Sequence, residues 1–70
     1  MMQQQELHRD LRDIFRQRVR ESFQRARQCL SHARMARCDG DSVNFRKWIW
    51  LSRVFRMAAA NWRERARGVL

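Results

Sequence analysis

Proline is absent from this sequence of 70 residues, and glycine occurs only at Gly40 and Gly68. Proline interrupts helices and glycine weakens them, so their scarcity favours long uninterrupted helices. The many Arg, Gln, Ala and Leu residues point the same way. No segment carries a strand pattern, and we expect an all-α chain.

Acidic residues are also scarce, because seven Asp and Glu stand against sixteen Lys and Arg and give a formal net charge of +9. Lys47 is the single lysine, so arginine carries nearly all of the positive charge. Guanidinium groups hold carboxylate or phosphate with a planar fork. A codon bias in a GC-rich genome would give the same enrichment. The charge balance favours an anionic partner or an acidic protein surface.

Long apolar runs are missing, and the first residues have neither a charged segment nor an apolar core. The most apolar stretch, Trp48 to Ala60, is interrupted by Arg53 and Arg56 and is too short to span a bilayer. Cys29 and Cys38 are nine residues apart, roughly 14 Å along a helix, and this distance prevents a bond between them. We expect a cytoplasmic protein with reduced thiols, no signal peptide and no membrane insertion.

Groups that could carry out catalysis are few. His8 and His32 are the only imidazoles, and neither has a nucleophile and an orienting acid beside it. Cys29 and His32 stand one helical turn apart, but together with Cys38 they match no standard zinc spacing. There is no glycine-rich phosphate loop. We expect no enzymatic activity, no metal and no cofactor.

A heptad repeat organises the C-terminal half. Large residues recur at every seventh position: Trp48, Phe55, Trp62 and Val69. A small residue follows each of the first three after four positions: Ser52, Ala59 and Ala66. On a helix these series form adjacent lines on one face, so bulky side chains stand beside gaps. This pattern predicts a seam that receives another helix.

The N-terminal half carries a matching stripe. Apolar residues recur there at steps of four: Leu7, Leu11, Phe15 and Val19. From Ser22 onward the inner line is small: Ser22, Ala26, Cys29, Ala33 and Ala36. These small residues leave gaps that the rings of Trp48, Phe55 and Trp62 can fill. The spacing of four between Glu21 and Arg25 also predicts a surface ion pair.

The two halves are separated by one break, where Gly40 can end a helix and Asp41 or Ser42 can begin another. We predict a single domain of residues 1–70, an antiparallel two-helix hairpin with helices at about 3–38 and 42–67 and a turn at 39–41. Its seam comprises Leu7, Leu11, Phe15, Val19, Trp48, Phe55 and Trp62.

Apolar residues remain after the hairpin closes. The region before about Phe15 has no partner within the shorter second helix, although Leu7, Leu11 and Ile14 share one side. On the second helix, three apolar residues lie away from the seam: Trp50, Val54 and Met57. A helix that is apolar on more than one face needs more than one neighbour. We therefore expect a homodimer with a four-helix arrangement.

Arginine ridges are the strongest functional signal. One ridge carries Arg20, Arg27 and Arg34 at steps of seven, near the line of Arg9 and Arg16. A second group is Arg56, Arg63 and Arg67, and another flanks Trp50. Trp and Arg are enriched in interface hot spots. We expect partner binding by a set drawn from both helices: Arg20, Arg27, Arg34, Arg46, Trp50, Arg53 and Met57.

Two partner classes remain open. The first is another protein with an acidic surface, because no catalytic or DNA-reading motif is present. The second is nucleic acid, bound through its backbone without regard to sequence, since two long helices offer no helix-turn-helix. A basic amphipathic helix can also lie on a membrane, but the second helix is apolar on both sides.

Size, the Arg/Ala-rich stretch from Arg25 to Arg37, the turn Asp39-Gly40-Asp41 and the aromatic second helix together resemble a known group. These are the small phage-encoded helical-hairpin inhibitor proteins of the anti-quorum-sensing type. The resemblance is one of pattern and assigns no binding residue. It implies a dimeric, non-enzymatic protein of a phage or mobile element that occludes a host protein, such as a transcriptional regulator.

Overall fold

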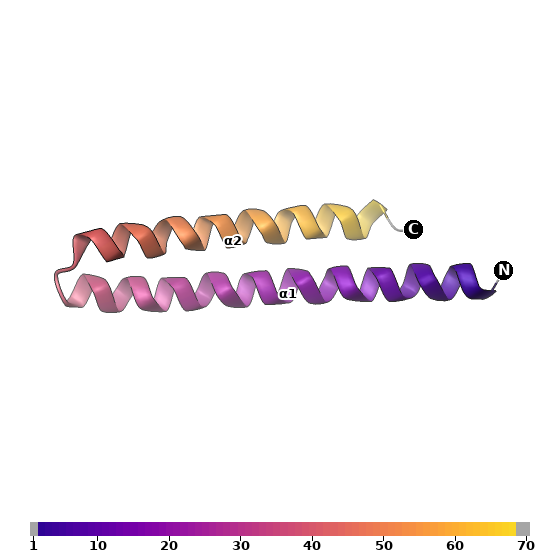
Figure 1. Cartoon of the computed structure of the whole chain (residues 1–70), viewed down its shortest axis with the longest axis horizontal. Helices are drawn as coiled ribbons and strands as arrows, with labels where there is room; N and C mark the ends of the chain where they lie inside the picture. The colour runs from indigo at the N-terminus through magenta and orange to yellow at the C-terminus, as the bar shows by residue number, and fades with distance from the viewer. Residues whose placement is uncertain (1, 69–70) are drawn as a thin grey trace.

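The computed structural model describes residues 2–68, which form two α-helices and no strand. Helix α1 spans Met2–Cys38 and helix α2 spans Ser42–Gly68. The helices lie side by side in opposite directions and form a rod with extents of 59 × 14 × 10 Å (Figure 1). The prediction of an all-helical chain whose two helices pack against each other is confirmed. Val69 of the heptad series lies outside the described residues.

Gly40 ends α1 with a left-handed φ of 72°. The backbone N–H of Asp41 donates to the carbonyl of Ala36 at 2.8 Å, and that of Gly40 donates to the carbonyl of Arg37 at 3.2 Å. These two bonds form a Schellman motif and satisfy carbonyls that the end of the helix leaves without partners. A Cβ at position 40 would meet no atom within 4 Å. Glycine is therefore favoured there by backbone conformation alone.

Asp41 begins α2. Its Oδ1 accepts a hydrogen bond from the backbone N–H of Asn44 at 3.1 Å, and its Oδ2 accepts one from the Asn44 side-chain amide at 2.6 Å. Its carbonyl accepts the first helical bond, from the N–H of Phe45 at 3.0 Å. Of the two residues that could cap α2, Asp41 is the N-cap, and Ser42 is the first residue of the helix.

We expect Asp41→Ala to lower the free energy of unfolding by about 1 kcal/mol, because the change removes this cap. Urea denaturation followed by circular dichroism measures the loss. Asp39→Ala is the matched control, because Asp39 is exposed in the same turn and its carboxylate makes no hydrogen bond or ion pair with any described residue. Equal losses in the two variants would contradict the assignment of the cap.

Small side chains form the centre of the helix interface. The buried residues of α1 are Ser22, Ala26, Cys29, Ala33 and Ala36, and those of α2 are Ser52 and Ala59. Small residues allow the two backbones to approach closely, so main-chain dispersion contacts replace large interlocking side chains. The buried hydroxyl of Ser52 donates to the carbonyl of Ile49 at 2.7 Å and is therefore satisfied.

The large rings flank this centre instead of filling it. Trp48, Phe55 and Trp62 are half-buried. Trp62 stacks on Phe15 with ring centres 5.8 Å apart, and Trp48 stacks on His32 at 4.5 Å. The rings are therefore only partly buried, where the sequence pattern predicted that they fill gaps between small residues of α1. By these pairings Trp48 lies level with the part of α1 that carries Ala33, and Trp62 lies level with the part that carries Phe15.

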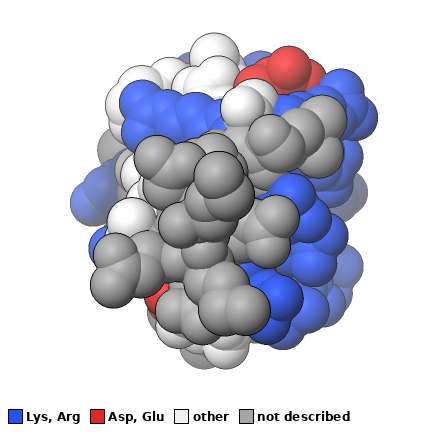
Figure 2. Space-filling view, turned by 90° about the vertical axis from the view of Figure 1, so that its right-hand side faces the viewer, with Lys and Arg blue, Asp and Glu red and all other residues white. Residues whose placement is uncertain are grey.

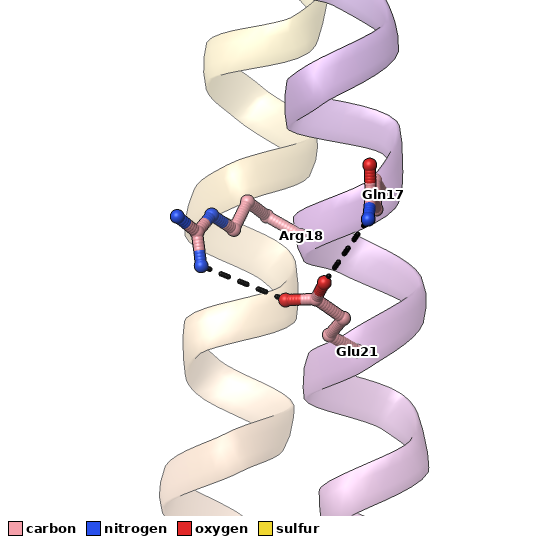
Figure 3. Close-up of polar contacts among 3 residues, drawn as sticks. All are labelled: Gln17, Arg18 and Glu21. Atoms are coloured by element: carbon pink, nitrogen blue, oxygen red, sulfur yellow. Dashed lines mark hydrogen bonds and ion pairs between the residues drawn. The ribbon is translucent and has the colours of Figure 1, made fainter.

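Charged side chains lie over the faces of two of these rings. The Arg25 guanidinium lies 5.9 Å from the centre of the Phe55 ring, and that of Arg65 lies 4.7 Å from the centre of the Trp62 ring. Glu21 accepts a hydrogen bond from the side-chain amide of Gln17 at 3.3 Å and pairs with Arg18 at 3.6 Å (Figure 3). The predicted pair of Glu21 with Arg25 is therefore replaced by a pair with Arg18.

Several large apolar side chains stay exposed. Phe15 and Val19 are half-buried in the seam, whereas Leu7 and Leu11 are 59% and 41% exposed. Ile14 is exposed beside them. On α2, four large apolar side chains are exposed: Val43, Trp50, Val54 and Met57. The single hairpin thus leaves apolar surface uncovered at the start of α1 and on α2.

Candidate functional site

A groove lined largely by arginine runs between the helices along one side of the hairpin, and we call it the arginine groove. It consists of two hollows of about 420 and 590 Å³ that share Arg20. The first is lined by Arg12, Arg16, Val19, Arg20, Arg63, Ala66 and Arg67. The second is lined by Arg20, Phe23, Ala26, Arg27, Leu30 and Arg56. Because both helices contribute, the groove exists only in the closed hairpin.

The spacing of the arginines explains why they form two walls. The α1 wall is Arg12, Arg16, Arg20 and Arg27, at steps of four and seven. The α2 wall is Arg56, Arg63 and Arg67, again at steps of seven and four. Such steps return a side chain to nearly the same face of a helix. A step of four separates two guanidinium stems by roughly 6 Å along the axis.

The floor of the groove is apolar. Val19, Phe23 and Leu30 are half-buried there, and Ala26 is buried. Arg63 crosses from α2 and places its guanidinium 5.6 Å from the centre of the Phe23 ring, at the junction of the two hollows. An exposed contact of this type is worth about 0.5–1 kcal/mol. Arg63 can therefore exchange the ring for an anion at small cost.

The charged side chains that line the groove are all positive. Over the described part of the chain, none of its lining residues is acidic. Glu64 pairs with Arg67 at 3.0 Å, but both side chains are about 70% exposed, so the pair contributes little. In the end-on view of Figure 2, blue Lys and Arg atoms run down one flank, and red is confined to small areas. Clustered guanidinium groups of this kind attract anions.

The predicted partner-binding set is divided between two surfaces. Arg20 and Arg27 line the arginine groove, and Arg34 is exposed on α1 one turn beyond Leu30. The remaining four recur at steps of three and four on α2: Arg46, Trp50, Arg53 and Met57. Trp50 and Met57 lie nearly opposite the buried Ser52 and Ala59, and Arg46 and Arg53 lie on the flank of α2 beside them. We call this surface, together with Val54, the outward face of α2.

Sequence reasoning missed five groove residues as members of one site: Arg12, Arg16, Arg56, Arg63 and Arg67. The ridge containing Arg16 and the group from Arg56 to Arg67 were each visible in the sequence. Their meeting was not, because it depends on how the helices are rotated about the seam. Projecting both helices from their small-residue lines in an antiparallel register would have placed the two series on the same side.

The groove offers anion binding rather than a reactive cluster. Among the side chains that the structure describes, those of residue 7 and residues 9–68, no group of three or more His, Cys, Asp and Glu could hold a metal ion. Cys29 is a buried free thiol in the seam, and Cys38 is an exposed one near the turn. Over the same residues, neither helix combines the length and apolar character needed to cross a membrane.

No protein-family model, curated protein or solved structure matches this chain. Its function is therefore inferred from the chemistry of the groove.

Proposed function

We propose that the protein is a non-enzymatic protein-binding module whose arginine groove holds an acidic segment of another protein. The observation that carries this proposal is the combination of guanidinium walls with an apolar floor. Carboxylates of the partner would pair with Arg16 and Arg63, and its apolar side chains would cover Val19 and Leu30. Charge-assisted hydrogen bonds to carboxylate are among the stronger polar contacts, particularly where water is partly excluded.

The apolar floor favours a protein over nucleic acid. Binding of nucleic acid without sequence preference relies on phosphate contacts, and its further gain comes from bases stacked on open rings. The Phe23 ring in the groove is covered by Arg63, and Trp50 is exposed on the outward face of α2, away from the arginine walls. A phosphate backbone would therefore contact the arginine walls and make no contact with the apolar floor.

Affinity capture tests the proposal. We expect the wild-type chain to capture acidic proteins whose binding survives nuclease treatment. Arg16→Gln/Arg63→Gln, which we call the groove variant, should lose them. Arg46→Gln/Arg53→Gln, the outer variant, removes the same charge from the outward face of α2 and should retain them. Loss of every captured species after nuclease treatment would contradict the proposal.

Nucleic acid remains the alternative ligand, because four-residue arginine steps of roughly 6 Å are similar to the spacing of phosphates along a strand. We expect weak binding of random duplex at about 0.1 M salt. Fluorescence anisotropy across a salt series measures the affinity. Tight binding with a log-log salt slope of several units, reduced by the groove variant, would favour the alternative.

A protein-binding module of this kind acts by covering the surface that it binds. Covering an acidic segment prevents that segment from meeting its own partner, so binding alone inhibits. We propose that the protein inhibits the protein it binds, as the resemblance to phage-encoded hairpin inhibitors implies. A transcriptional regulator of a bacterial host is a target of this class.

We also propose that two hairpins associate into a four-helix homodimer. The exposed apolar residues at the start of α1 would pack against the outward face of α2 of a second copy. The charges beside these surfaces are complementary, because Asp10 and Asp13 lie near the first and Arg46 and Arg53 lie on the second. Antiparallel alignment of the two rods brings these surfaces together and leaves both arginine grooves open.

Sedimentation tests the dimer. We expect the wild-type chain to sediment with twice the mass of one copy. Met57→Glu should give a single copy that remains helical, because a carboxylate on an apolar interface loses its hydration. Ser31→Glu is the control, since Ser31 is exposed on α1 and the charge change is the same. A wild-type chain that sediments as one copy at all concentrations would remove the proposal.

A further inference from the structure

We infer that the segment held in the arginine groove is an amphipathic α-helix with an apolar stripe and acidic residues along both edges. This inference rests on the proposed function and specifies its partner. The groove runs along α1 from Arg12 to Leu30. Eighteen residues of helix cover roughly 27 Å, so the occupant is a helix of about five turns.

Backbone hydrogen bonding selects a helix over an extended segment. Both walls are helices whose main-chain groups bond within α1 and α2. An extended peptide lying over Val19, Phe23 and Leu30 would lose water from its N–H and C=O groups without gaining main-chain partners. A helix satisfies these groups internally and presents only side chains to the floor.

The arrangement of walls and floor also matches a helix. Acidic residues at steps of four rise by roughly 6 Å, the same step that separates Arg12, Arg16 and Arg20 on α1. Arg63 and Arg67 repeat that step on α2. An apolar stripe at steps of three and four fits between these two walls and covers the floor. The occupant then completes a three-helix arrangement.

A second copy of this chain does not fit that description. The acidic residues of α2 are limited to Glu64 within the described range. On α1, Glu21 is already held by Gln17 and Arg18, and Asp10 and Asp13 lie three residues apart on one side of the helix. Neither helix carries an apolar stripe bordered by acidic residues on both edges. Two copies joined through this groove would also place one set of guanidinium groups against the other. The occupant is therefore a different protein.

Arg63 controls access to the floor. In the structure its guanidinium lies over the Phe23 ring and separates the two hollows. A helix can reach the floor only when Arg63 turns away from the ring. A carboxylate on the edge of the incoming helix provides Arg63 with a new partner, so acidic edges both open the groove and bind it.

Three synthetic peptides of about 18 residues test the inference by fluorescence anisotropy and circular dichroism. The stripe peptide has Leu and Ala at steps of three and four, with Glu along both edges. The scattered peptide has the same composition and charge, with its apolar residues distributed around the helix. The broken peptide is the stripe peptide with two central prolines. Each is titrated with wild type, the groove variant and the outer variant, all of which are first checked for helicity.

We expect wild type to bind the stripe peptide at least tenfold more tightly than the other two and to increase its helicity. The groove variant should lose at least tenfold, and the outer variant should stay within about twofold. Leu30→Ser, which changes the floor without changing charge, should weaken the stripe peptide selectively. These results support the inference.

Equal affinity for all three peptides, still reduced in the groove variant, would overturn the helical occupant and leave the proposed function standing. Affinities that are the same in the groove variant as in wild type would overturn both. If the groove variant loses helicity, Leu30→Ser and the comparison of the three peptides with wild type still decide between a helical and an extended occupant.

Discussion

Ala59→Leu is expected to unfold the hairpin. Ala59 is 0% exposed and lies in the interface between two cross-helix contacts, that of Phe55 with Arg25 and that of Trp62 with Phe15. Three extra carbon atoms at that position must push the two helices apart along the seam, because their surroundings are backbone and small side chains. Overpacking typically costs 1–3 kcal/mol, and a rigid interface of this type lies at the upper end, about 3 kcal/mol. A domain of this size has roughly 3–5 kcal/mol in total.

Circular dichroism and thermal denaturation measure the loss. Ala60→Leu is the matched control, because it makes the same substitution at the next residue, which is exposed. We expect that variant to keep the stability of the wild-type chain, since leucine is nearly as good a helix former as alanine. If both variants melt at the wild-type temperature, the close approach of the helices is wrong.

The sequence pattern suggests the opposite order of sensitivity to substitution for Ala59 and Trp62. From the heptad repeat, Trp62 would be the most sensitive residue, because a large side chain in a seam usually carries most of the buried area. In the structure Trp62 is half-buried, stacked on Phe15 and covered by Arg65. Trp62→Ala should therefore cost roughly 2 kcal/mol, below the 3–5 kcal/mol of a fully buried ring. The small residue Ala59 is therefore expected to tolerate substitution less well than the large residue Trp62.

The elements of the fold could be predicted because each has a local cause. The absence of proline permits long helices, Gly40 supplies the left-handed residue that ends α1, and Asp41 supplies the cap of α2. How deeply a side chain is buried in the helix interface has no local cause. Periodicity gives the face of α2 on which Trp48 lies, but its burial also depends on the α1 side chains that the register places beside it, here the stacked ring of His32.

The arginine groove could be predicted only in part, because the role of an arginine also depends on how the two helices pack. Arg20 and Arg27 were identified as a ridge, but an arginine that covers a ring and an arginine that lines a groove look alike in a sequence. Arg25 and Arg65 each place their charge over an aromatic ring, and the attraction between charge and ring stabilises the hairpin. Arg16 and Arg67 line an open hollow, and Arg63 does both. Only the packed hairpin shows which of these uses an arginine has.

Reversing the charge of two arginines on facing walls should weaken the preference of the groove for an acidic partner. Arg16→Glu/Arg63→Glu lowers the formal net charge from +9 to +5, since each reversal removes two units, and it places carboxylates on both walls of the first hollow. We expect affinity for the Glu-edged stripe peptide to fall by roughly 100-fold, about 3 kcal/mol, because two attractions become repulsions. Affinity for a peptide with the same stripe and Lys edges should rise above that of the wild-type chain.

Fluorescence anisotropy with the two peptides measures the change, and Arg46→Glu/Arg53→Glu supplies the control with the same net charge. If the peptides merely respond to total charge, both charge-reversed chains will change affinity by the same factor. If they dock between the walls, the groove reversal will narrow the difference between the two affinities, and the outward reversal will remain close to wild type. Because the floor of Val19 and Leu30 is unchanged in both chains, the apolar contribution is constant and the comparison isolates the position of the charges.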